Sequence, residues 1–203
     1  MKRNVAAMAT PRYLLVDPEL PLCSHLVSGC VRGAFLCGWD KKTRKDYSHR
    51  KQWLEQRMFA LSRSFAVGIY AHAIMSNHVH VVVRYDPKAS LAWSDEEVAE
   101  RWLNACPPRI RGHASAIDVW AQARQAILRS PKRLEAHRNW LGLVSNFMKH
   151  LKQPIAARAN LDDQVAGHFF EKRFYSRVLL DESSTLAAMA YVDLNPVRAN
   201  IAH

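Results

Sequence analysis

Apolar residues recur along the first half of the chain at strand-like and helix-like intervals in turn. Cys23 to Arg32 has the composition of a short strand, and Ser48 to Ser64 carries apolar residues at helical spacing. Phe65 to Met75 alternates apolar with smaller residues, and a Ser-Asn pair at 76–77 is a plausible turn into His78 to Tyr85. The pattern predicts a strand, a helix and then a β-hairpin.

The second half continues with a helix and a strand, separated from the first half by a long insertion. Trp140 to Leu151 carries apolar residues at steps of three and four, which is typical of an amphipathic helix, and Gly167 to Leu180 has the pattern of a final strand. The intervening segment Asp86 to Asn139 does not fit this order. It contains helical candidates of its own at Ser94 to Asn104 and Ala116 to His137.

This element order predicts an α+β fold of the ferredoxin-like, split β-α-β class. In that fold a four-stranded antiparallel sheet carries two helices on one face and leaves the other face open. One more helix follows, because Ser183 or Ser184 can cap Thr185 to Leu194 and Pro196 disfavours continuation past Asn195. We expect residues 1–203 to form one domain, with 86–139 inserted between the third strand and the second core helix.

Charge adds an expectation about the partner. Lys and Arg outnumber Asp and Glu by 29 to 18, which gives a formal net charge of +11. An excess of this size attracts phosphate backbones without sequence specificity, so a nucleic-acid partner is favoured.

Composition also bears on location. The chain has no apolar run long enough to span a membrane, and Met1 to Thr10 lacks the apolar core of a secretion signal, so we expect cytoplasmic residence. The cysteines form no C-x-x-C pair and are predicted to be free thiols. They are Cys23, Cys30, Cys37 and Cys106.

The first chemical motif is a pair of histidines on the third predicted strand. Because side chains alternate along a strand, His78 and His80 project from one face, while Val79, Val81 and Val83 point to the other. Two imidazoles on one face could ligate a metal ion, but a third ligand is needed. The same pattern also occurs in purely structural histidines.

Tyr191 and Asn195 form the second motif. They stand four residues apart on the last predicted helix, so the phenol and the amide share a helical face. A phenol has a pKa of about 10, so it attacks phosphate usefully only where a metal or another cation stabilises the phenolate. The amide oxygen of Asn195 could complete a metal site with His78 and His80, although an isolated tyrosine is more often structural.

These residues resemble the single-tyrosine HUH transposases, and within them the REP-associated tyrosine transposases. The resemblance begins at Ser24-His25-Leu26-Val27 and is strong through Met75-Ser76-Asn77-His78-Val79-His80. It resumes in the segment 167–174, which precedes the segment 190–199. The latter is similar to the family's nucleophile helix and its asparagine-proline end.

The resemblance implies that His78, His80 and Asn195 hold a divalent ion, Mg²⁺ or Mn²⁺, and that Tyr191 is the nucleophile. Attack would leave a 5′-phosphotyrosine and a free 3′-hydroxyl, and resealing would need no ATP and no nucleotide site. The implied substrate is single-stranded DNA with a REP-like hairpin, bound by a monomer or homodimer near the nucleoid. Whether the tyrosine helix acts in its own subunit or a partner's stays open.

Basic side chains near these motifs are candidates for contacts with DNA phosphates. On the predicted core they are Lys149, Lys152, Arg173 and Arg177. The insertion adds a dispersed basic set interspersed with tryptophans, a composition that suits nucleic-acid backbones and base stacking. Its members are Arg101, Arg109, Arg111, Arg124, Arg129, Lys132, Arg133 and Arg138, with Trp102, Trp120 and Trp140 between them. Trp140 is expected in the core from its helical register.

Two other classes of function stay open. A non-catalytic nucleic-acid-binding module on the same fold would present aromatic residues on the open sheet face, where the third strand has His78, His80 and Val82. A domesticated relative would bind hairpin DNA as a regulator and cleave it poorly. A cleavage assay separates both from the transposase interpretation.

Overall fold

The structure, a computed structural model, describes residues 20–31, 34–113 and 115–199. The segment Met1 to Thr10 and the end of the first predicted strand at Arg32 lie outside these ranges. The elements of the sheet domain follow the predicted order. They are β1 Leu22–Gly29, α1 His49–Ser64, β4 Val67–Ile74, β5 His78–Tyr85, α5 Val144–Asp163, β6 Tyr175–Leu179 and α6 Glu182–Arg198.

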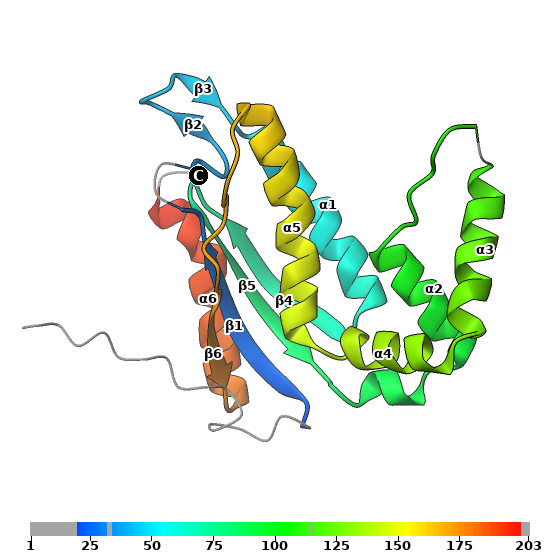
Figure 1. Ribbon diagram of the computed structural model, residues 1–203. Coiled ribbons are helices and arrows are strands. Elements are labelled where there is room, and N and C mark those ends of the chain that lie inside the picture. The colour runs from blue at the N-terminus through cyan, green and yellow to red at the C-terminus, as the bar shows by residue number, and fades with distance from the viewer. Residues whose placement is uncertain (1–19, 32–33, 114, 200–203) are drawn as a thin grey trace, which may run out of the picture.

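The main sheet has the strand order β4-β5-β1-β6, and every neighbouring pair is antiparallel. The chain therefore places its first strand between its third and last strands, as a split β-α-β fold requires. Helices α1 and α5 lie side by side along one face (Figure 1). The predicted α+β, ferredoxin-like class is confirmed.

The opposite face of the sheet is covered, contrary to the prediction that it stays open. Helix α6 of the same chain packs along this face, behind the sheet in Figure 1. Val192 is fully buried there against Ala71, Ala73 and Val82. The reason is steric: alternation brings two alanines of β4 to this face, and their small side chains let a helix approach closely.

The main core lies between the sheet and the helices α1 and α5. Val79, Val81 and Val83 point into it from β5, and Phe147 and Leu151 enter from α5. Burial of an aliphatic or aromatic side chain of this kind stabilises a fold by about 1.5–3 kcal/mol. This face therefore supplies most of the apolar stabilisation, and it orients the residues that alternate onto the α6 side.

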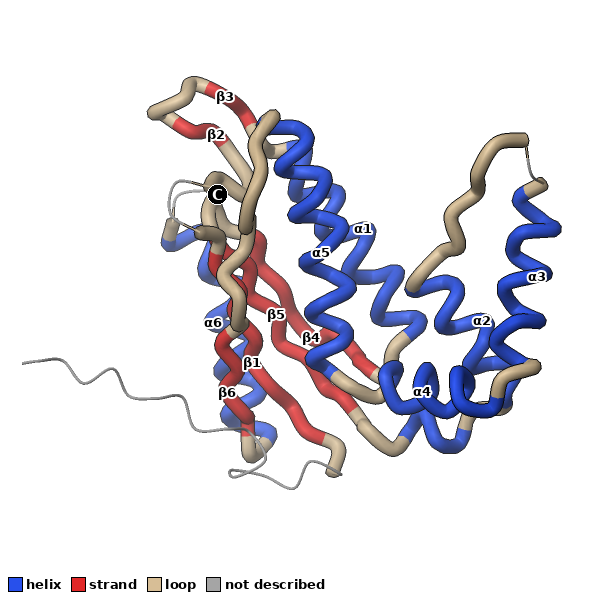
Figure 2. The backbone as a smooth tube through the Cα atoms, in the orientation of Figure 1, coloured by secondary structure: helices blue, strands red, loops and turns tan. Residues whose placement is uncertain are grey.

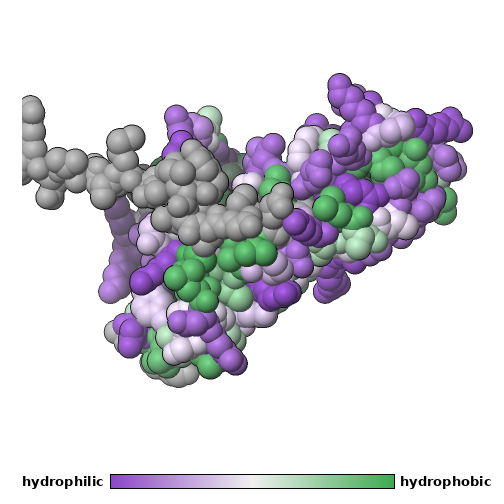
Figure 3. Space-filling model, turned by 90° about the horizontal axis from the view of Figure 1, so that it is seen from below, coloured by the Kyte–Doolittle hydropathy of each residue, from purple (hydrophilic) through white to green (hydrophobic). Residues whose placement is uncertain are grey.

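The insertion forms a separate group of helices beside the sheet domain (Figure 2). It consists of η2 Ala89–Ala92, α2 Asp95–Ala105, α3 Ala116–Leu128 and α4 Pro131–Leu141. The single helix predicted over 116–137 is wrong, because Pro131 has no backbone N–H to continue the helix and instead starts α4 at its first position. Seen from below, hydrophilic side chains predominate at this end of the molecule, with hydrophobic patches between them (Figure 3).

Helix α5 begins at Val144, not at the predicted Trp140. Trp140 belongs to α4 and is 43% exposed, so its predicted core position is wrong. Its ring instead contacts Trp102 and His137 within the insertion, at centroid distances of 5.3 and 5.5 Å. The apolar residues on both sides of the α4–α5 junction are spaced as in one helix, so the sequence did not indicate the break at 142–143.

The last strand and the last helix also differ from their predicted bounds. Only Tyr175–Leu179 is strand, whereas 167–174 is irregular apart from a bridge between Phe170 and Cys30. Helix α6 starts one turn earlier than predicted and is capped by Asp181, whose carboxylate accepts from Ser184 N at 2.6 Å. Pro196 lies inside the helix. A two-stranded hairpin, β2 Trp39–Asp40 and β3 Lys45–Asp46, was not predicted.

All four cysteines are free, as predicted. Burial is the largest cause that raises the pKa of Cys30, to about 12, and it also raises that of Cys37. These thiols therefore stay protonated near neutral pH. Within the described residues, no helix has the length and apolar character needed to cross a membrane.

Candidate functional site

His78 and His80 lie together on the α6 face of the sheet. The turn at 76–77 closes with a hydrogen bond from Met75 N to His78 O, 2.8 Å, so β5 begins at His78 itself. The two imidazole centroids are 4.7 Å apart. Strand alternation therefore produces the histidine pair that the sequence predicted, with Val79 directed to the main core between them.

Each imidazole of this pair has its Nδ1 atom engaged. His78 Nδ1 lies 2.7 Å from Asn77 Oδ1, and since an amide oxygen only accepts, His78 Nδ1 carries the proton. His80 Nδ1 lies 2.9 Å from Nε2 of His25. A hydrogen bond at one ring nitrogen orients the imidazole and leaves the other nitrogen to bind a ligand. Nε2 is therefore the coordinating atom that each ring can offer.

His25 was not among the predicted site residues. It stands on β1 opposite Val82, so it is a diagonal neighbour of His80 on the same sheet face. The two rings stack with centroids 5.1 Å apart. The sequence did indicate the face of His25, because its neighbour Leu26 is apolar and adjacent strand residues point to opposite faces. It did not indicate the register of β1 against β5, which brings His25 beside His80.

The local environment keeps these imidazoles neutral. Burial lowers the pKa of His80 to about 4, and the neighbouring His78 and His25 contribute further. Burial likewise lowers the pKa of His78, and burial followed by the charge of Arg177 lowers that of His25. Because a metal binds the unprotonated imidazole, this environment favours ligation near neutral pH.

Tyr191 is positioned by the packing of α6. The buried Val192 fixes the rotation of the helix, and Tyr191 then lies beside the histidines at its edge. Its ring centroid is 6.0 Å from those of His80 and His25. Tyr191 is 44% exposed, so part of the residue reaches solvent. A tyrosine that touches the histidine cluster and still reaches solvent can meet an extended substrate.

Asn195 lies one turn after Tyr191 on α6, and its amide Nδ2 is buried with no hydrogen-bond partner among the described residues. Leaving such a group unpaired costs about 1–3 kcal/mol. Rotation of the amide by a half-turn would present the oxygen instead, which is a ligand atom that divalent cations prefer. Two neutral imidazoles and an amide oxygen would together be a chemically suitable donor set for a divalent ion. Within the described residues, no three His, Cys, Asp or Glu side chains form such a group, so Asn195 would be essential.

A cleft of about 590 Å³ opens between β6 and α6 beside this cluster. Tyr191 and His25 line one part of it, and Arg177 and Tyr175 line the β6 side. Tyr175 is 62% exposed. The cleft thus joins a phenol, a guanidinium and an imidazole around a volume that could admit a phosphodiester.

The four predicted DNA-contacting residues do not form one surface. Arg177 alone lies in the cleft with Tyr191. Lys149 and Lys152 belong to α5, on the other face of the sheet, where they line a second cleft. Arg173 is exposed in the segment between α5 and β6. In the insertion, several basic side chains are exposed, namely Arg109, Arg111, Arg129, Lys132 and Arg133.

Comparison with known proteins gives likeness to solved structures. No protein-family model and no curated protein matches the chain. A solved structure of a REP-associated tyrosine transposase bound to a REP hairpin is similar over 89% of this chain and 70% of that chain. The identity is 9% and the TM-score is 0.48, a level that carries no argument about chemistry.

Proposed function

We propose that this chain is a metal-dependent endonuclease and strand transferase that cleaves single-stranded hairpin DNA through Tyr191. The observation that carries the proposal is the position of the Tyr191 ring, 6.0 Å from the His80 ring, on the face where both strand histidines project. A solvent-accessible phenol beside potential metal ligands is the arrangement that a tyrosine nucleophile needs.

His78 Nε2, His80 Nε2 and the amide oxygen of Asn195 would hold the ion. For His80 this requires the tautomer in which Nδ1–H donates to His25 Nε2. A bound Mg²⁺ or Mn²⁺ would act as a Lewis acid toward a phosphate oxygen. The mixed imidazole and amide donors do not select the ion, and Mg²⁺ or Mn²⁺ is proposed from the family resemblance. The neutral charge of these donors would leave the full cationic charge available to an anionic substrate.

The covalent step is a substitution at phosphorus. Tyr191 Oη forms a bond to the phosphorus, the bond from phosphorus to the 3′ oxygen breaks, and the released 3′ oxygen takes up a proton. The phenol proton leaves to water, which reaches Tyr191 through the open cleft. Arg177 in the same cleft can contact the phosphate charge. Reversal by another 3′-hydroxyl rejoins the strand without ATP, because the phosphoester bond energy is retained.

The open-sheet alternative, a nucleic-acid-binding module that stacks bases on strand residues, has less support. Helix α6 covers that face, and the strand residues beneath it include His80, Val82 and Ala73. Base-stacking sheets need exposed aromatic residues there.

The test uses a pool of labelled hairpin oligonucleotides with Mn²⁺ or Mg²⁺ and denaturing electrophoresis. We expect a metal-dependent protein–DNA adduct that disappears in Tyr191→Phe, while DNA binding persists. Tyr175→Phe is the matched control, because Tyr175 is the other tyrosine lining the cleft. DNA binding without any adduct or nick would overturn the proposal and favour a binding module or a regulator that does not cleave.

A further inference from the structure

A second cleft lies on the other side of the edge strand β6. It runs between α5 and the irregular segment 167–174 and has a volume of about 410 Å³, within the range of about 300–1,000 Å³ usual for small-ligand sites. The lining of this cleft includes Phe174, and that of the Tyr191 cleft includes the next residue, Tyr175, on the edge strand β6. We call it the α5 groove.

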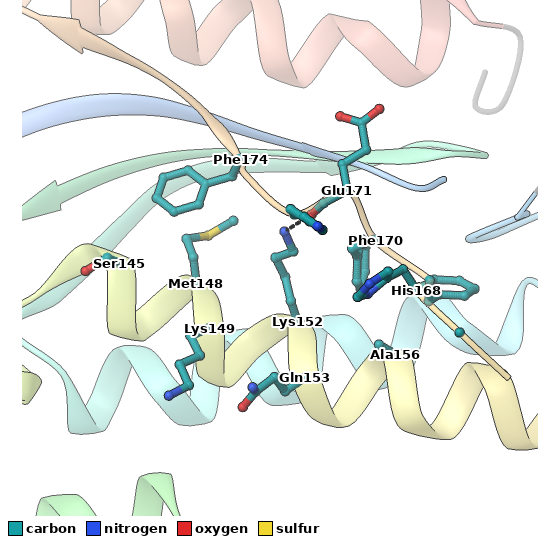
Figure 4. A pocket seen from close by; sticks show the side chains of 13 residues that line it. Ser145, Met148, Lys149, Lys152, Gln153, Ala156, His168, Phe170, Glu171 and Phe174 are labelled. Carbon is teal, nitrogen blue, oxygen red and sulfur yellow. Dashed lines mark hydrogen bonds between the residues drawn. The ribbon is translucent and has the colours of Figure 1, made fainter. Parts of the chain in front are cut away.

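The walls of the α5 groove are aromatic and apolar. Figure 4 shows Phe174 and Met148 on one side and Phe170 and His168 on the other, with Lys152 between them. Phe170 is 5% exposed and joins the main core, so it is a fixed wall. Phe174 is only partly buried. A flat aromatic side chain at an open groove offers a stacking surface for a nucleobase.

The charge of the groove is positive. Lys149, Lys152 and Lys172 line it, and the one acidic lining residue, Glu171, directs its carboxylate away from it, toward the face where α6 lies (Figure 4). That carboxylate lies beside Gly29, 3.5 Å from where a Cβ would stand. The Glu171 carboxylate still attracts the Lys152 ammonium, but it is one negative charge against the three lysines that line the groove.

Lys152 is the central cation. Its Nζ donates to the backbone oxygen of Glu171 at 2.8 Å and lies 5.5 Å from the centroid of the Phe170 ring. Within the described residues, no carboxylate oxygen lies at ion-pair distance from it, and burial lowers its pKa. An ammonium has three N–H donors, and one of them is used by Glu171 O. A partly desolvated cation between aromatic walls is suited to an anionic ligand with an aromatic ring.

We propose that the α5 groove binds one unpaired nucleotide of the DNA strand that is processed at Tyr191, with its base against Phe174 and its phosphate on Lys152. This inference rests on the proposed function for the identity of the strand. A single strand that leaves the Tyr191 cleft can round the edge of β6 and enter the groove. Arg173 is exposed in the connecting segment and can contact the intervening backbone.

The test measures binding of the full chain without added metal, so that no strand is cut. The probes are a fluorescent oligothymidylate of about 12 nucleotides and an abasic strand of equal length, a length within the usual site sizes. We expect Phe174→Leu to weaken oligothymidylate binding by about 5- to 150-fold and to leave abasic binding unchanged. The plot of log affinity against log salt has a negative slope, and Lys152→Met should make it less steep by about 0.7, as expected for the loss of one phosphate contact.

Lys41→Met is the matched control, since Lys41 is an exposed lysine on the turn between β2 and β3, away from the groove lining. It should bind both probes as the wild type does. Equal affinity of the wild type for the two probes, absence of binding to either, or wild-type binding by both groove variants would each overturn the groove proposal.

The adduct assay at saturating hairpin DNA separates the two proposals. If the groove variants form the Tyr191 adduct normally but lose base-dependent binding, both proposals stand. Base-dependent binding without any adduct in the wild type would leave the groove in place and refute cleavage. An adduct together with wild-type binding by the groove variants would refute the groove alone.

Discussion

Strand β5 presents opposite kinds of side chain to the two faces of the sheet. Val79, Val81 and Val83 enter a closely packed core under α1 and α5, whereas His78 and His80 project under α6 beside a solvent-exposed tyrosine. The first face provides apolar burial. The second has a small apolar contact around Val192 and a cluster of imidazoles in which His80 is buried and His25 and His78 are partly buried. Stability and candidate chemistry are therefore separated by strand alternation, and substitutions on the two faces should have different consequences.

The largest expected effect on stability is on the α5 face. Phe147 is fully buried and packs edge-on against Phe65, with ring centroids 5.9 Å apart. Phe147→Ala should lower the free energy of unfolding by about 3–5 kcal/mol, measured by urea denaturation. Val192→Ala, the control on the α6 face, should cost about 2 kcal/mol. A larger loss for Val192→Ala would contradict the assignment of the main core to the α5 face.

Acidification should destabilise the α6 face through His80. The folded pKa of His80 is about 4, below its ordinary value of 6.5, so between these values the unfolded chain binds more protons. Stability from this residue is therefore complete above about pH 6.5 and falls by up to about 3 kcal/mol as the pH drops to about 4. Urea denaturation across this window should show a shallower loss in His80→Gln. An identical pH dependence in the variant would refute a neutral, buried His80.

His137 provides a comparison for this pH effect. It lies in the insertion, stacked on Trp102, and burial lowers its pKa to about 4 as well. His137→Gln should flatten the same pH window but leave metal affinity unchanged, because His137 is not in the site.

Removal of the hydrogen bond to His80 should weaken metal binding. His25→Leu eliminates the contact between His25 Nε2 and His80 Nδ1, and loss of such supporting partners typically costs about 10- to 100-fold in metal affinity. His25→Gln retains a side-chain amide and should recover part of the loss. Mn²⁺ titration calorimetry measures both variants. Equal affinity in wild type and His25→Leu would show that His25 does not orient a ligand.

The smallest expected effect on stability comes from Ser28, a buried polar residue on the α5 face. Ser28 lies on β1 and, by strand alternation, points to the face opposite His25, toward α5. Its hydroxyl is buried there with no hydrogen-bond partner among the described residues. Ser28→Ala removes a desolvated hydroxyl, so it should leave stability unchanged or raise it by up to about 1 kcal/mol. Thermal denaturation detects this, and a clear loss of stability would mean that the hydroxyl has a stabilising role on this face.

The sequence predicted most of the fold, because local periodicity specifies it. The hairpin and α1 follow from alternation and helical spacing, and the strand order follows from the fold class that the order of elements predicts. Junctions were less predictable, since the periodic pattern continued across Pro131 and Leu143. The docking of α6 depends on Ala71 and Ala73 reaching the same face, which is a tertiary contact.

The sequence predicted the site residues that are close together along the chain, but not the residue that joins them through strand pairing. His78 with His80, and Tyr191 with Asn195, are pairs at short sequence spacing. His25 joins them only through the register of β1 against β5. The separation of Lys152 from Arg177 could not be foreseen either, because the irregular course of 167–174 determines which face each residue reaches.

The central claim, that Tyr191 forms the covalent bond, is tested most directly by locating the adduct. Trypsin cleavage after Arg173, Arg177 and Arg198 places Tyr175 and Tyr191 in different peptides, 174–177 and 178–198. Mass spectrometry of the digested adduct should find the nucleotide on peptide 178–198, with fragmentation placing it on Tyr191. A nucleotide on peptide 174–177, or on any peptide without Tyr191, would contradict the account.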